Sequence, residues 1–166
     1  KLFEKAGVNI SFVHGTLSEE RARAMQTRGR KCEVGAKYQA AALSFVCHAQ
    51  SPFIPTLRGD IRIFAMENER GNQFWGGGGV DLTPVYIDES QISEFHKHWK
   101  RVCDNFDSSY YHHFKQQCDD YFYLPARGEW RGVGGLFFDD LVLNQDELVR
   151  FLITLSTEFV PSYQPI

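Results

Sequence analysis

Apolar side chains recur every three or four positions in two stretches of the second half of the chain, which is the spacing of one buried helix face. The first helix is expected to begin at Asp88, because Gln91 follows three residues later as in a capping box. The second is expected to begin at Asn144, with Glu147 in the same relation. Residues 110–124 are predicted to form a further helix. The apolar stripes of the two capped helices are Ile92, Phe95, Trp99 and Val102, and Leu148, Phe151, Leu152, Leu155 and Phe159.

The first half of the chain carries patterns typical of strands. Residues 36–49 are mostly small and β-branched, which predicts a buried strand. In residues 57–67 the charged side chains Arg58, Asp60 and Arg62 stand at alternate positions. Successive side chains of a strand point to opposite faces, so a strand here places all three charges on one face.

The remaining segments complete an antiparallel arrangement. Residues 68–72 predict a hairpin turn, after which residues 73–86 return as the partner strand. Residues 131–139 predict a further strand, and Ser18 is expected to cap a short helix that runs through Met25. We therefore expect an α+β fold, in which a large antiparallel β-sheet is flanked by α-helices, formed by residues 1–166 as one domain.

Composition narrows the function classes. The 166 residues carry 18 Lys and Arg against 21 Asp and Glu, and this net charge of -3 argues against a basic domain that coats nucleic acid. No apolar run approaches the roughly 20 residues needed to span a bilayer. Aromatic residues make up 14 %, which indicates large packed faces or a pocket for a flat apolar partner. The four cysteines form no C-x-x-C pair and are expected to be buried or idle thiols.

The least ordinary segment is a run of four glycines, residues 76–79, inside a predicted strand. A phosphate-binding loop would need a following Lys and Ser or Thr, whereas Val80 and Asp81 follow here, so nucleotide binding is disfavoured. Two interpretations stay open. The run forms a bulged strand with tight sheet packing, or it forms a flat glycine floor beneath a flat ligand with Asp81 at its edge.

Asp81 itself lies between two apolar residues, Val80 and Leu82. Burying a carboxylate in such surroundings is costly unless it is paired. Asp81 therefore either caps the turn at Thr83 and Pro84 or serves as a base or acceptor for N–H groups.

Four arginines, Arg58, Arg62, Arg127 and Arg131, form a candidate anion site. Arginine binds carboxylates through two parallel hydrogen bonds and keeps its charge, so this group suggests a polyanionic substrate in an aromatic pocket. The alternative is that these arginines pair only with acids of the chain itself. The candidate acids are Asp60, Glu67, Glu129, Asp139 and Asp140.

Two longer motifs of the sequence resemble those of a known enzyme family. The chain resembles the oxygen-dependent coproporphyrinogen III oxidases through GGG-x-DLTP in residues 76–84 and RGE-x-RG-x-GG-x-FFDDL in residues 127–141. Similar segments extend from SFVHGTLSEE, residues 11–20, to FVPSYQPI, residues 159–166. The resemblance implies oxidative decarboxylation of two propionates of coproporphyrinogen III, a reduced tetrapyrrole with four propionates. O2 is the co-substrate, CO2 and hydrogen peroxide are released, and no organic cofactor takes part.

The resemblance also implies roles for single residues. Asp81 matches an aspartate thought to engage the pyrrole N–H groups, and Arg62 and Arg131 match arginines expected to hold propionates. Ser44 matches a serine assigned to substrate binding. The residues 60–62, Asp60, Ile61 and Arg62, match a substrate-contacting N-x-R segment of the family.

The sequence departs from the family pattern at three places. Arg58 stands where the family has a histidine proposed as proton donor; arginine is a poor general acid, although it can clamp a carboxylate. Asp60 replaces an asparagine, and Ala126 replaces a histidine. Of four histidines proposed elsewhere as metal ligands, only His48 and His96 remain, so no metal is expected. The catalytic candidates are thus Asp81 and Arg58.

These departures leave two functions open. The chain is an active oxidase, or it is a catalytically impaired family member that binds a tetrapyrrole or serves as a structural subunit of a larger assembly. The family normally continues for about another third beyond FVPSYQPI, so the fold is expected to lack its C-terminal part. A homodimer is expected if the full fold is present. Since the chain begins at Lys1, the compartment stays open between plastid, mitochondrion and cytoplasm.

Overall fold

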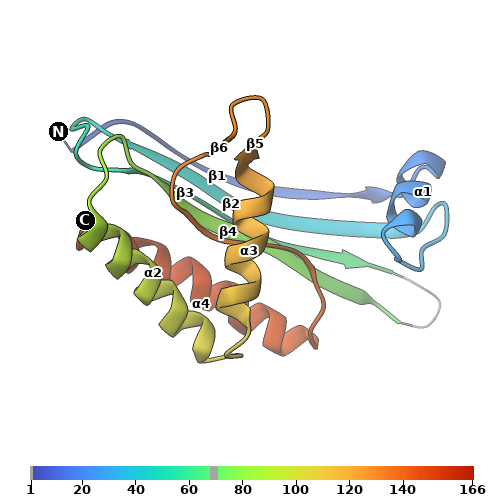
Figure 1. Cartoon of the computed structure of the whole chain (residues 1–166). Coiled ribbons are helices and arrows are strands. Elements are labelled where there is room, and N and C mark those ends of the chain that lie inside the picture. The colour runs from blue at the N-terminus through green and yellow to red at the C-terminus, as the bar shows by residue number, and fades with distance from the viewer. Residues whose placement is uncertain (1, 68–70) are drawn as a thin grey trace.

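The computed structural model describes residues 2–67 and 71–166 and shows a sheet with helices on both sides (Figure 1). Five antiparallel strands form the sheet in the order β1-β2-β3-β4-β7, and β5 and β6 form a separate two-stranded hairpin. The expected α+β fold is confirmed. The strands are β1 (Phe3–Thr16), β2 (Lys37–Ala49), β3 (Thr56–Met66), β4 (Gln73–Thr83), β5 (Tyr123–Leu124), β6 (Glu129–Trp130) and β7 (Gly134–Leu141), and the helices are α1 (Glu19–Thr27), α2 (Glu89–Asp104), α3 (Tyr110–Phe122) and α4 (Gln145–Tyr163).

Three helices begin where their capping residues predict. The side chain of Ser18 accepts a hydrogen bond from the Arg21 backbone N–H at 3.3 Å. The Asp88 carboxylate accepts hydrogen bonds from the first turn of α2, and the Asn144 side chain accepts one from the Glu147 N–H at 2.9 Å. Each bond satisfies a backbone donor that the helix itself leaves unpaired.

Some element boundaries differ from the sequence prediction. β4 ends at Thr83 rather than at residue 86, because Pro84 has no N–H to continue the ladder. α3 ends at Phe122, and Tyr123 pairs with Trp130 in the small hairpin. β7 begins at Gly134, and the turn expected at residues 68–72 lies largely outside the described residues.

The first strand, β1, is absent from the sequence prediction. Its apolar residues Val8, Ile10 and Phe12 do alternate, but they are 71 %, 80 % and 64 % exposed. β1 pairs with β2 along its whole length at the edge of the sheet. Apolar side chains thus recur at every second position of β1, but these side chains do not belong to the core.

Helices α2 and α4 lie together on one face of the sheet, and α3 crosses its β7 edge (Figure 1). The stripes predicted for α2 and α4 supply much of this core: Phe95, Trp99, Phe151 and Leu148 are almost fully buried. They pack on the apolar residues of β3, β4 and β7. One face of the sheet is therefore occupied by the main core.

Helix α1 covers only one end of the opposite face. There Phe64 stacks between Tyr38 and Trp75, with ring centroids 5.4 and 4.4 Å away, and Met25 of α1 packs against this group. The charged positions of β3 lie on this same face, because they are separated from Phe64 by even numbers of residues along the strand. The core and the candidate site thus occupy opposite faces of one sheet.

Two further expectations can be compared with the structure. All four cysteines are free thiols, and burial raises the pKa of Cys103 and Cys118 to about 12, so both thiols stay protonated. Among the described residues, no helix has the length and apolar character required to cross a membrane.

Candidate functional site

The charged positions of β3 lie opposite small residues on both neighbouring strands. Arg62 pairs in register with Ala42 on β2 and Gly77 on β4, and Asp60 pairs with Ser44 and Gly79. Such small neighbours leave space above the sheet, and the predicted alternation of charges on one face is confirmed by the shared cavity that these side chains line.

This cavity has a volume of about 480 Å³ and brings together six of the residues singled out from the sequence. They come from four segments: β2, β3, β4 and the turn before β7. Aromatic rings of α3 and β7 form a wall beside them. The six residues are Ser44, Arg58, Asp60, Arg62, Asp81 and Arg131, and the rings are Tyr121, Phe122 and Phe137, with Phe45 from β2.

Asp81 is the buried acid of this cavity, with 4 % of its surface exposed. Nη2 of Arg131 donates to both carboxylate oxygens, at 3.0 and 2.9 Å. Nη1 of Arg58 lies 3.8 Å from the carboxylate and donates to the hydroxyl of Thr83 at 2.9 Å. Asp81 is therefore held between two guanidinium groups.

Arg131 is fixed by more than this ion pair. Its guanidinium lies 3.7 Å from the centroid of the Phe122 ring, a cation–π contact. Its backbone N–H donates to the Phe122 carbonyl at 3.0 Å. The end of α3 thus positions the arginine that neutralises Asp81.

Burial raises the pKa of the Asp81 carboxyl above its ordinary value, and the neighbouring Arg131 and Arg58 act in the opposite direction. Removal from water disfavours the charged form of an acid, whereas a nearby cation favours it. A carboxylate with a raised pKa is a stronger proton acceptor than an exposed one, which suits a base that operates near neutral pH.

Pairing with acids of the chain is found for all four arginines. Arg62 binds Asp60 and lies 3.3 Å from Asp139, and Arg127 lies 2.7 Å from Glu129. Arg58 and Arg131 both pair with Asp81, the buried acid of the chain. The cation cluster of the cavity is thus made of three arginines, of which two contact the buried acid.

Two predicted substrate contacts lie away from the cavity. Arg127 is in the turn between β5 and β6, with 70 % of its side chain exposed. Ile61 packs against the main core on the opposite face, because it alternates with Asp60 and Arg62 along β3. Their roles in substrate binding stay predictions.

The glycine run fits the first interpretation left open by the sequence, a bulged strand with tight sheet packing, whereas the floor beneath a flat ligand stays a prediction. A Cβ at Gly79 would lie 2.5 Å from the Leu136 carbonyl oxygen of β7, and the pairing of β4 with β7 shifts register between Gly76 and Gly78. Tight packing and an irregular ladder are therefore confirmed. Gly77, Gly79 and Asp81 stand two residues apart on β4, which places all three on the cavity face.

The two histidines considered as remnants of a metal site have other partners. His96 is hydrogen-bonded through one ring nitrogen to the Val133 carbonyl and through the other to the Tyr111 hydroxyl. Nδ1 of His48 lies 3.2 Å from the Thr56 hydroxyl. In residues 2–67 and 71–166 no three His, Cys, Asp or Glu side chains form a metal-binding group, and the expectation of no metal stays a prediction.

Sequence reasoning anticipated an aromatic pocket but did not identify its rings. Tyr121 stacks on Phe137 with ring centroids 4.2 Å apart, and Phe122 supports Arg131. The local signal was a cluster of aromatic residues in CDDYFYL, residues 118–124, followed by the FFDD segment. No short sequence pattern indicates that the end of α3 packs against β7.

Comparisons with known proteins agree on one family. A family model described as coproporphyrinogen III oxidase matches residues 1–166. The chain is 45 % identical over 170 residues to the mitochondrial oxygen-dependent coproporphyrinogen-III oxidase of Homo sapiens and 44 % identical over 171 residues to that of Rattus norvegicus. It is 42 % identical over 172 residues to coproporphyrinogen-III oxidase 1, chloroplastic, of Arabidopsis thaliana. These matches include 99–100 % of this chain and 37–45 % of the relatives' length, so the chain spans less than half of each relative.

Proposed function

Because the chain belongs to the coproporphyrinogen III oxidase family, we propose that it carries out the oxidative decarboxylation of coproporphyrinogen III to protoporphyrinogen IX in haem or chlorophyll synthesis. The observation that supports this most is the buried Asp81 between Arg131 and Arg58, on one face of a cavity with aromatic walls. A site that combines a buried base, guanidinium groups and flat rings suits an anionic macrocycle.

The substrate would use each part of the site differently. Pyrrole N–H groups are donors, and Asp81 is an acceptor with a raised pKa in the cavity. Propionates are carboxylates, which guanidinium groups bind with directed, charge-assisted hydrogen bonds. Arg62 and Arg131 are the residues proposed to hold them, with Ser44 and Asp60 beside them.

The proposed reaction converts a propionate side chain, –CH2–CH2–COO⁻, into a vinyl group, –CH=CH2, and CO2. This change releases two electrons and one proton. O2 takes up the two electrons and two protons and leaves as H2O2, so each decarboxylation consumes one proton overall. Asp81 is proposed to stabilise positive charge on the pyrrole or to accept its N–H proton while the electron-rich ring reacts with O2, with no organic cofactor.

A second function is favoured by Arg58. The guanidinium occupies the place where the resemblance leads us to expect a histidine, and it does not release a proton near neutral pH. Arg58 also donates to Thr83 and lies near Asp81, which fixes it as a cation of the site. On this alternative the chain binds a tetrapyrrole, alone, as a homodimer or as a subunit of a larger assembly, without turning it over.

Product analysis separates the two functions. The intact protein is mixed with coproporphyrinogen III without oxygen, air is then admitted, and the oxidised products are resolved by chromatography. The oxidase predicts protoporphyrin together with CO2 and peroxide above a protein-free control. Coproporphyrin alone, with substrate binding retained, would contradict the oxidase and support the binding protein.

A further inference from the structure

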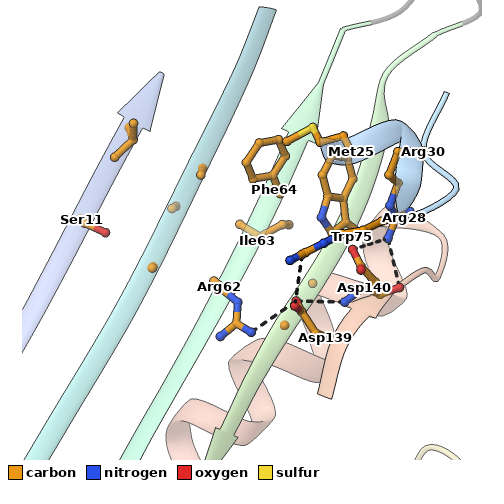
Figure 2. Close-up of a pocket in the computed structure, with 16 residues that line it drawn as sticks. Ser11, Met25, Arg28, Arg30, Arg62, Ile63, Phe64, Trp75, Asp139 and Asp140 are labelled. Carbon is orange, nitrogen blue, oxygen red and sulfur yellow. Dashed lines mark hydrogen bonds and ion pairs between the residues drawn. The ribbon is translucent and has the colours of Figure 1, made fainter. Parts of the chain in front are cut away.

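A second hollow lies beside the main cavity on the same face of the sheet. It has a volume of about 280 Å³ and lies between the segment that follows α1 and the end of β7 (Figure 2). Ala42 and Arg62 line both hollows, so the two adjoin at these residues. We call this second hollow the Arg28–Arg30 groove.

Three guanidinium groups converge on two carboxylates in the Arg28–Arg30 groove (Figure 2). Arg28 and Arg62 approach the two oxygens of Asp139, at 3.8 and 3.3 Å. Arg30 lies 2.8 Å from Asp140. Arg62 also binds Asp60, so three guanidinium groups meet three carboxylates here, and a bound anion has to displace one of these carboxylates from its arginine.

The pairs made by Asp139 are open to exchange. The side chains of Arg28 and Asp139 are 66 % and 43 % exposed, and that of Arg62 is 36 % exposed. Ion pairs with such exposure contribute little stability, because water and salt screen them and long side chains lose freedom in forming them. A ligand carboxylate can therefore take the place of Asp139 as partner of Arg28 or Arg62 at little cost.

Arg30 is the rigid member of the group. Its guanidinium lies 4.5 Å from the centroid of the Trp75 ring, and Nη2 also donates to the Asp140 carbonyl at 3.2 Å. Only 14 % of its side chain is exposed, and its Nε is buried without a hydrogen-bond partner. A buried N–H donor without an acceptor is costly, and a carboxylate is the kind of group that would satisfy it.

The base of the groove is made of small residues. Ala40 and Ala42 lie on β2, and Gly77 lies opposite Arg62 on β4. A Cβ at Gly77 would come within 2.7 Å of Nε of Arg62, so glycine is what allows the Arg62 side chain to lie across the strand. Of these small residues, Ala42 also lines the main cavity, so the two hollows share a surface at Ala42 and Arg62 along which a flat molecule can extend.

From this geometry we propose that the Arg28–Arg30 groove is a second carboxylate subsite, which binds a propionate of the same tetrapyrrole whose macrocycle lies over Asp81. Arg62, which both hollows share, lies between the reacting part of the substrate and this anchored carboxylate. The inference rests on the proposed function and deepens it. The subsite favours macrocycles with four carboxylates over those with two.

Two porphyrins that do not react provide the test. Coproporphyrin III carries four propionates and protoporphyrin IX carries two, and equilibrium dialysis measures the Kd of each for the intact protein. The variants are Arg28→Gln and the double variant Arg28→Gln/Arg30→Gln. The control is Arg23→Gln, an exposed arginine of α1 that pairs with Glu19 and lines neither hollow.

We expect the double variant to raise the Kd of coproporphyrin III at least tenfold and Arg28→Gln alone to raise it about threefold, on the scale of lost charged hydrogen bonds. The Kd of protoporphyrin IX should change less than twofold, and Arg23→Gln should change neither value. Arg28→Gln removes only an exposed side chain, so this variant tests the subsite even if the double variant folds poorly.

Two results would overturn the subsite while leaving the proposed function intact. Unchanged binding of coproporphyrin III in Arg28→Gln and the double variant would show that the groove carries only an ion-pair network between the α1 segment and β7. Equal losses for both porphyrins would show that the arginines support the site structurally. Failure of the unmodified protein to bind either porphyrin would instead overturn the proposed function, and the subsite with it.

Discussion

Arg131 and Asp81, fifty residues apart in the sequence, form a two-oxygen ion pair at the candidate site, with Nη2 of Arg131 3.0 and 2.9 Å from the carboxylate oxygens. Asp81 is 4 % exposed, so the pair joins a buried acid to an arginine that lines the cavity. The arrangement keeps an acid in apolar surroundings, provides it with a counter-ion, and leaves its pKa above the ordinary value. Three of the predictions below follow from this pair and its surroundings.

Replacing Arg131 by Gln should move the pH dependence of activity. Arg131 lowers the pKa of Asp81 against the effect of burial, so its removal raises that pKa further. If the deprotonated acid is the active form, the acidic limb of kcat/KM against pH shifts to higher pH, and substrate affinity falls. Arg23→Gln on α1 is the control and should leave the profile unchanged. An acidic limb that stays in place in Arg131→Gln would contradict the role of Asp81 as the titrating base.

Asp81 should also affect folding stability as a function of pH. Its pKa is raised in the folded state, so the folded protein holds this proton to higher pH than the unfolded chain does. The stability that the protonated acid provides is therefore present at low pH and lost as the pH rises from the ordinary aspartate pKa through the raised one. Urea unfolding of wild type and Asp81→Asn should show the wild type losing stability relative to the variant over this interval. A difference independent of pH would contradict the raised pKa.

Gly79→Ala should destabilise the sheet beneath the cavity. The new Cβ would lie 2.5 Å from the Leu136 carbonyl oxygen, which is backbone and cannot move without disturbing β7. Overpacking of this kind costs about 1–3 kcal/mol or more. Gly7→Ala on β1 is the matched control, because its Cβ would have no neighbour within 4 Å. Urea denaturation measures both variants, and equal stabilities would show that β4 and β7 are not closely packed at this position.

The packing of α4 can be tested away from the site. Leu148 is fully buried, and its Cδ1 lies where a Cβ of Gly76 would come within 2.7 Å. Leu148→Ala should lower the free energy of unfolding by about 2–5 kcal/mol through lost burial and the cavity left behind. Ile153→Ala on the same helix, at a side chain 56 % exposed, should cost much less. Similar losses in thermal or urea unfolding would contradict the placement of α4 on the sheet.

The sequence predicts those helices and strands whose defining contacts lie within a few residues along the chain. Asp88 and Asn144 are followed by helices because each side chain accepts hydrogen bonds from the first turn of its own helix. The alternate charges of β3 lie on one face because strand geometry requires it. β1 is not among the predicted strands, because Val8 and Ile10 face solvent at the edge of the sheet and form no buried face.

The site was predicted less completely, because it depends on contacts between distant segments. Arg127 and Arg131 are only four residues apart, but Arg127 lies in the turn of the small hairpin and Arg131 beyond it, against Phe122. No pattern in the sequence indicates that Arg131 lines the cavity and Arg127 does not. Likewise, nothing local shows that Arg30 meets Trp75, because that contact requires the segment after α1 to lie on β4.

The most direct test of the proposed function compares wild type with Asp81→Ala in turnover of coproporphyrinogen III, measured as CO2 released and protoporphyrin formed after oxidation. We predict that wild type releases two CO2 for each protoporphyrin and that Asp81→Ala, with an unchanged circular dichroism spectrum, loses turnover by about 10²–10⁴-fold, the range for removal of a general base. Equal turnover in the two proteins would contradict the placement of Asp81 at the reacting centre, and absence of CO2 from wild type would contradict the oxidase itself.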